Sequence, residues 1–83
     1  MSNRLRLLDM TEGERGTILS VQGGGGVRHR LETMGVRRGM AIEKVTGSPF
    51  GGPVIVKIGN VRLAIGYGMA GKIIVEVKRA GAL

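Results

Sequence analysis

The sequence predicts an all-β fold: a small barrel of five to six short strands with one short helix. Apolar and polar residues alternate with the period of two that half-buried strands require, most clearly in Val54–Ile58 and Val61–Ile65. Sixteen glycines and two prolines punctuate the apolar runs, which indicates many tight turns. We expect the barrel to be closed or nearly closed, because closure removes exposed strand edges.

The length and the absence of an internal repeat predict a single domain. A chain of 83 residues can build one modest hydrophobic core. We expect this domain to span residues 1–83, with its core from about residue 5 to about residue 77. The ends, Met1–Arg4 and Lys78–Leu83, are expected to be loose.

The first third of the chain predicts two strands separated by a turn. Leu5, Leu7 and Leu8 indicate a short first strand or an extended edge segment. Thr11–Glu14 contains glycine between polar residues and predicts the turn. Gly16–Val21 is the next predicted strand, and its expected core residues are Ile18 and Val21.

A short amphipathic helix is predicted around Leu31. Val27, Leu31 and Met34 share one helical face, and Gly35 stands where a helix commonly ends with positive φ. Because so short a helix is marginal alone, we expect it to be held by docking on a sheet, with Leu31 as the central anchor. The preceding glycines, 23–26, lack the other residues of a nucleotide-binding motif and are interpreted as a flexible connection.

The second half predicts a turn, a strand, a corner and two hairpin strands before the last strand. Arg37–Gly39 is the turn, Met40–Thr46 the strand, and Ser48–Pro53 the corner. A two-residue turn at Gly59 and Asn60 joins the hairpin. A single helical turn is expected before the last strand, around Met69 and Ala70. The predicted inward-facing residues are Val54, Val56, Ile58, Val61, Leu63, Ile65, Ile73, Val75 and Val77.

Three segments together resemble the ferrous iron transport protein A (FeoA) family. They are R-L-x-x-M-G-V-x-x-G-M at Arg30–Met40, S-P-F-G-G-P-V at Ser48–Val54 and I-I-V-E-V at Ile73–Val77. The resemblance implies an SH3-like barrel that assists a membrane ferrous iron transporter carrying a cytoplasmic G domain. The chain departs from the family at Gly66–Gly71, where members often carry a charged helical turn.

The residue inventory argues against an enzyme and a resident cofactor. The sequence has no cysteine, which excludes thiolate metal sites, and no arrangement of nucleophile and base is visible. His29 and Glu32 are the candidate metal ligands, and Glu12 and Glu14 beside Asp9 are an alternative cation patch. Both sets are also explained as solvated surface, so we expect no high-affinity metal site.

The formal charge of +7 favours an anionic partner, which would be nucleic acid, an acidic protein surface or the anionic leaflet of a membrane, with a merely solvated basic surface as the alternative. Arg28, Arg30, Arg37 and Arg38 bracket the predicted helix and are the candidate partner-binding cluster, with a merely solvated basic face as the alternative. Only Phe50 and Tyr67 are aromatic, which disfavours polyproline ligands and the binding of single-stranded nucleic acid by base stacking. Phe50 is expected to plug the barrel end, with a partner anchor as the alternative. Tyr67 is the better candidate for a partner anchor.

These observations give two hypotheses for function. The first is a small accessory protein of bacterial ferrous iron uptake that acts by contact with the transporter. The second is a regulatory module that binds a transcription factor or nucleic acid through its basic face. No apolar run approaches the ~18–20 residues of a membrane span, and no signal-peptide pattern is visible, so we expect a cytoplasmic protein. The sequence leaves the oligomeric state open.

Overall fold

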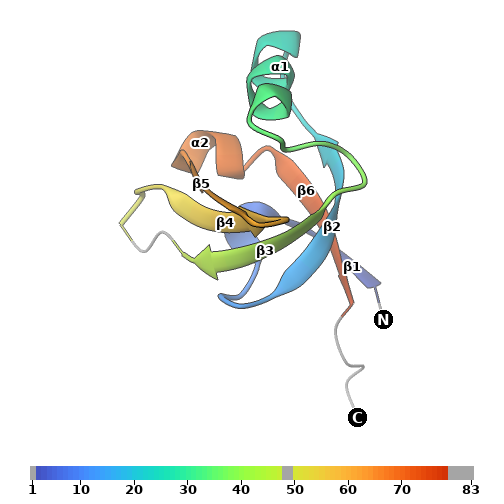
Figure 1. The fold of residues 1–83 in the computed structure, drawn as a ribbon, viewed down its shortest axis with the longest axis vertical. Helices are drawn as coiled ribbons and strands as arrows, with labels where there is room; N and C mark the ends of the chain where they lie inside the picture. Colours follow the sequence, from blue (N-terminus) through green and yellow to red (C-terminus); the bar gives the residue numbers. More distant parts are fainter. Residues whose placement is uncertain (1, 48–49, 79–83) are drawn as a thin grey trace.

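The computed structural model describes residues 2–47 and 50–78, which form one strongly bent antiparallel sheet with short helical segments (Figure 1). The predicted all-β fold is therefore confirmed. In chain order the elements are β1 Ser2–Arg6, the 3-10 turn η1 Leu7–Asp9, β2 Arg15–Val21, α1 Gly25–Thr33, β3 Ala41–Thr46, β4 Val54–Ile58, β5 Val61–Ile65, α2 Tyr67–Ala70 and β6 Ile73–Lys78.

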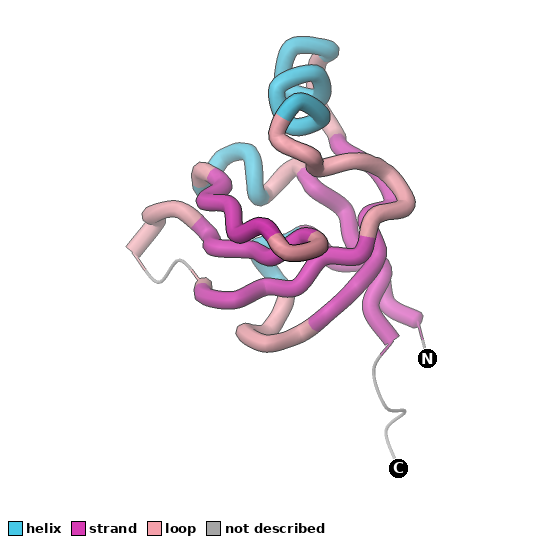
Figure 2. Tube along the Cα trace, viewed as in Figure 1, coloured by secondary structure: helices cyan, strands magenta, loops and turns pink. Residues whose placement is uncertain are grey.

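The six strands of the described residues follow the order β1-β6-β2-β3-β4-β5, and the sheet curls around a single core (Figure 2). The β4–β5 hairpin pairs Val54 with Ile65 and Ile58 with Val61. Its turn contains Gly59 at φ +61°, a conformation that glycine adopts at little cost. The order begins at β1 and ends at β5, and no pairing among the described strands joins these two, so hydrogen bonding does not close the barrel there.

The core consists of the inward-facing strand residues and a few residues from the connections. Alternation holds in β4 and β6, where every predicted inward residue is buried. It fails at Val61, which is 56% exposed because β5 lies at the end of the sheet and its first residue follows the turn directly. The buried apolar residues are Leu7, Met10, Ile18, Leu31, Val36, Ile42, Val54, Val56, Ile58, Ile65, Ala70, Ile73, Val75 and Val77.

The described residues at both chain ends, which were expected to be loose, belong to paired strands. Arg4 pairs with Glu76 and Ser2 pairs with Lys78, so β1 adds a strand to the edge of β6. This pairing gives the backbone groups of both segments partners. The predictions for Met1 and for residues 79–83 lie outside the described residues. Leu7 and Leu8 form a 3-10 turn instead of a strand, which brings the Leu7 side chain into the core.

Helix α1 ends as the sequence predicts but sits differently from a helix laid flat on a sheet. The amide of Gly35 donates to the Glu32 carbonyl at 3.0 Å, and the amide of Val36 donates to the Leu31 carbonyl at 2.9 Å. With Gly35 at φ +94°, this is the Schellman arrangement. Leu31 and Val36 are fully buried, and α1 stands at one end of the barrel (Figure 1).

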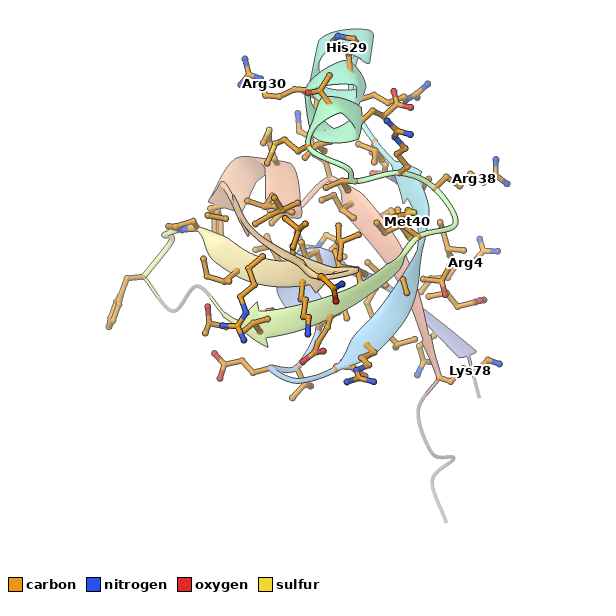
Figure 3. The ribbon with its side chains drawn as sticks, viewed as in Figure 1. Arg4, His29, Arg30, Arg38, Met40 and Lys78 are labelled. Atoms are coloured by element: carbon orange, nitrogen blue, oxygen red, sulfur yellow. The ribbon has the colours of Figure 1, made fainter. Side chains whose placement is uncertain are left out.

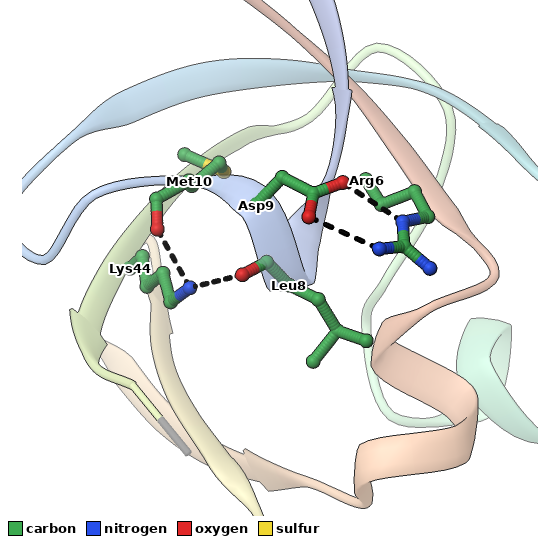
Figure 4. A network of polar contacts seen from close by, with 5 residues as sticks. All are labelled: Arg6, Leu8, Asp9, Met10 and Lys44. Atoms are coloured by element: carbon green, nitrogen blue, oxygen red, sulfur yellow. Dashed lines mark hydrogen bonds and ion pairs between the residues drawn. The ribbon is translucent and has the colours of Figure 1, made fainter. Parts of the chain in front are cut away.

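A buried lysine, which the sequence analysis missed, ties β3 to the segment around η1 (Figure 4). Lys44 is 4% exposed, and its Nζ donates to the carbonyls of Leu8 at 2.9 Å and Met10 at 2.6 Å. Burial lowers the pKa of Lys44, and nearby carboxylates, first that of Asp9, oppose the shift. The sequence pattern indicated that Lys44 points inward, because Lys44 lies two positions after the inward-facing Ile42 and therefore on the same face of the strand.

We expect Lys44→Met to lower the free energy of unfolding by about 1–3 kcal/mol, because two carbonyls lose their donor while the apolar part of the side chain is kept. Chemical denaturation would measure the loss. The matched control is Lys57→Met on β4, an exposed lysine in the neighbouring strand, which should shift stability by only about 0.5 kcal/mol. Equal effects of the two substitutions would show that the Lys44 network does not stabilise the fold.

Candidate functional site

Three exposed arginines line a groove between β2, α1 and the segment that joins α1 to β3. The groove has a volume of about 340 Å³. We call it the arginine groove and define it by the residues that line it: Leu19, Ser20, Val21, Arg28, Glu32, Val36, Arg37 and Arg38.

The groove forms because the segment that precedes β3 follows β2 only part of the way. The Ile18 amide donates to the Met40 carbonyl at 2.9 Å, and the Gly39 amide donates to the Ile18 carbonyl at 2.8 Å. Gly39, at φ +89°, then turns the chain away from β2. On the β6 side, the register of β2 shifts between Ile18 and Ser20, as in a β-bulge, which re-aims side chains.

The floor of the groove is apolar, whereas its walls carry charge. Val36 is buried, and Leu19 and Val21 are half-buried. Arg28 projects from α1, and Arg37 and Arg38 project from the following segment; all three arginines are exposed. Arg37 Nε donates to the backbone carbonyl of Glu32 at 3.4 Å, which directs this guanidinium toward the helix end.

The charges of these arginines are available to a partner. Among the described residues, ion pairs join Arg6 to Asp9 and Arg15 to Glu43, and none involves the arginines of the groove. Glu32 is the only carboxylate among the lining residues. The groove can therefore attract a negatively charged ligand without first breaking an internal ion pair.

Three of the four arginines that the sequence analysis assigned to partner binding lie at this groove. Arg28, Arg37 and Arg38 line the groove, whereas Arg30 does not. Figure 3 shows Arg30 on the side of α1 opposite to Arg38. The separation follows from helix geometry, because residues two positions apart on a helix do not face the same way.

The two aromatic candidates lie elsewhere on the surface. Phe50 is 97% exposed, so the expectation that it plugs the barrel end is wrong. Its loop follows the last residue of β3, whereas the groove adjoins the first, so the length of β3 separates them (Figure 1). Tyr67 begins α2 and is 50% exposed. The structure thus leaves Phe50 and Tyr67 as separate exposed residues.

The candidate metal ligands His29 and Glu32 are exposed residues of α1. No group of three histidine, aspartate or glutamate side chains that could hold a metal lies within residues 2–47 and 50–78. His29 points outward at the free end of α1 (Figure 3). In the alternative cation patch, Glu12 accepts from the Gly47 amide at 2.6 Å and Glu14 from the Thr11 amide at 2.9 Å. Hydrogen bonds from Arg6 lower the pKa of Asp9.

Sequence reasoning missed the floor of the groove. Leu19, Val21 and Val36 are brought together by the bulge in β2 and by the turn after α1. A β-bulge has no reliable signature in a single sequence, so their grouping could not be read from spacing alone.

The fold is a small SH3-like β-barrel whose surface carries a basic, partly apolar groove. The chain belongs to the FeoA domain family, whose model matches residues 5–77. This family is associated with ferrous iron transport. No curated protein matches the chain. In the described part of the chain, no helix has the length and apolar character needed to cross a membrane.

Solved structures agree with the family assignment. The crystal structure of an iron uptake regulatory protein, FeoA, is 36% identical, with a TM-score of 0.82, and the match covers 88% of this chain and 96% of that one. FeoA from Chlorobium tepidum is 26% identical, with a TM-score of 0.81, and the match covers 94% and 74% of the two chains.

A manganese-dependent transcriptional repressor shares the fold. Its TM-score is 0.85 at 16% identity, and the match covers 94% of this chain but 44% of the repressor. Less than half of that protein is therefore represented here, and the likeness concerns the fold alone.

Proposed function

We propose that this protein is an accessory protein of bacterial ferrous iron uptake that contacts the cytoplasmic G domain of the membrane iron transporter through the arginine groove. The observation that carries the proposal is the set of three arginines that line one groove without internal ion pairs. Membership of the FeoA domain family supplies the biological setting.

The chemistry of the proposed role is recognition at the surface. The barrel interior is filled by buried side chains, so a partner must bind outside. Unpaired arginines around an apolar floor speed the encounter with an acidic surface and fix its orientation. Iron is the cargo of the transporter in this proposal, and the accessory protein does not carry it.

We expect Arg37→Glu combined with Arg38→Glu to weaken binding to the G domain at least about tenfold, because attraction becomes repulsion across the contact. Isothermal titration at several salt concentrations would measure both the affinity and its salt dependence. The fold should be retained, since exposed turn substitutions shift stability by only about 0.5 kcal/mol.

The matched control is Lys57→Glu combined with Arg62→Glu. These residues are exposed, face each other across β4 and β5, and lie outside the arginine groove. The control changes the net charge by the same amount, so it separates a local contact from a general charge effect. Equal affinities of the two double variants for the G domain would place the interface elsewhere.

The basic surplus also supports the second hypothesis, a regulatory module that binds nucleic acid. A duplex DNA oligonucleotide tested in the same titration discriminates between the two. Nucleic acid binding falls steeply with salt whatever the base sequence. Tight DNA binding that survives physiological salt, without binding to the G domain, would favour the regulatory module.

A further inference from the structure

The backbone of β2 has a free edge beside the arginine groove. The Gln22 amide donates to the Lys72 carbonyl at 2.7 Å, so the backbone polar groups of Gln22 point toward β6. Val21 precedes Gln22 and is aligned with Ile73 of β6. In an antiparallel pair, successive residues direct their N–H and C=O groups to opposite sides of the strand. The N–H and C=O of Val21 therefore point away from β6.

That side of β2 is occupied by the arginine groove. The strand β3 pairs with β2 from Arg15 to Thr17, and the preceding Gly39 and Met40 continue the contact as far as Ile18. Beyond Ile18, the described residues place no further strand against this edge. Val21 itself lines the groove. A strand edge with unused hydrogen-bonding groups is a template for another backbone.

We propose that the arginine groove binds an extended acidic peptide segment that pairs with β2 at Val21. One edge of the segment's backbone forms hydrogen bonds with the N–H and C=O of Val21. Its carboxylates meet Arg28, Arg37 and Arg38, and an apolar side chain rests on the half-buried Leu19. This deepens the proposed function, on which it rests for its biological setting, by naming the kind of segment that a partner must present.

The lining residues favour a peptide over a nucleic acid. Glu32 stands among the arginines and would repel a phosphate backbone, whereas a peptide can place a neutral or basic residue beside it. No aromatic side chain lines the groove, so bases have no surface on which to stack. A free strand edge with flanking pockets is a recurring mode of peptide recognition.

The test uses the whole protein and a synthetic decapeptide that alternates valine and glutamate. Amide hydrogen exchange of Val21, followed by NMR, gives the most specific readout, because this amide is free before binding. We expect rapid exchange in the free protein and at least about tenfold protection when the peptide is in excess. A decapeptide that alternates valine and lysine is the charge control and should leave Val21 unprotected.

Two N-methylated peptides locate the pairing edge without altering the protein. In an extended strand, the valine amides point to one side and the glutamate amides to the other. Methylating the amides on the side that pairs with β2 should lower affinity about tenfold, whereas methylating the other set should not. Equal losses, or no loss in either peptide, would overturn the strand-pairing geometry.

Val21→Pro tests the same contact from the protein side, since proline removes an N–H that the sheet does not use. Should this variant fail to fold, the N-methylated peptides still decide the question. Absence of Val21 protection at millimolar acidic peptide, or equal protection by a DNA oligonucleotide, would refute the inference. The acidic peptide could fail to protect Val21 while the G domain still binds through Arg37 and Arg38. That result would refute this inference but not the proposed function.

Discussion

Gly16→Ala is expected to destabilise the protein by about 1–3 kcal/mol or more, a cost typical of overpacking. A Cβ added at Gly16 would lie 2.6 Å from the backbone carbonyl oxygen of Glu76 and 2.9 Å from a methyl carbon of Val77, and it would also collide with Val75. Two of these neighbours are core residues, and the third is backbone, so none can move freely. Strands β2 and β6 would have to separate where they pair.

The control for this prediction is the same substitution at Gly26, in α1. A Cβ there meets nothing within 4 Å, and Gly26 is not among the glycines with positive φ. Because alanine favours a helix over glycine, Gly26→Ala should stabilise the protein by about 0.5–1 kcal/mol. Chemical denaturation of both variants should therefore give changes of opposite sign. A loss below about 0.5 kcal/mol for Gly16→Ala would contradict the close packing of β2 on β6.

Leu31→Ala should cost about 2–4 kcal/mol, because it removes a fully buried side chain from the core and leaves a cavity. Leu31 is the buried residue of α1, whereas Val27 is only half-buried. A helix of this length has little stability of its own, so losing this anchor should also loosen α1 and the groove beside it. Unfolding in denaturant measures the first effect, and amide exchange in α1 measures the second.

His29→Ala serves as the matched control within the same helix. His29 is exposed and leaves the core untouched, so its replacement should shift stability by only about 0.5 kcal/mol. A loss smaller than this in Leu31→Ala would mean that α1 is not held by docking.

Much of the fold could be predicted because local patterns and tertiary structure agree in the second half of the chain. The alternation of β4 and β6 matches the buried face of each strand, and Gly59 occupies the turn between β4 and β5. The helix C-terminus at Gly35 was also predictable, since positive φ restricts that position largely to glycine.

The failures have a common physical origin in contacts between distant segments. Lys78 was expected to be loose because it lies near the end of the chain, yet β1 supplies it with a strand partner. Phe50 was expected to plug the barrel end because of its place in the Pro/Gly corner, yet its side chain is exposed to solvent. Lys44 was overlooked because its acceptors, the carbonyls of Leu8 and Met10, come from a segment more than thirty residues earlier.

The candidate site was predictable in its charge but not in its shape. Arginines close together in sequence indicated a basic surface, and three of them line the groove. Which arginine faces away depends on the orientation of α1 at the end of the barrel. The apolar floor and the free edge at Val21 depend on where β3 leaves β2.

The central claim is that the arginine groove is the surface that contacts the transporter, and an NMR map of the isotope-labelled protein titrated with the G domain tests it most directly. We expect the largest amide shift changes at Val21, Arg28, Arg37 and Arg38, all of which line one groove. Changes centred on Tyr67 and Met69 instead, with the residues of the groove unmoved, would contradict the account.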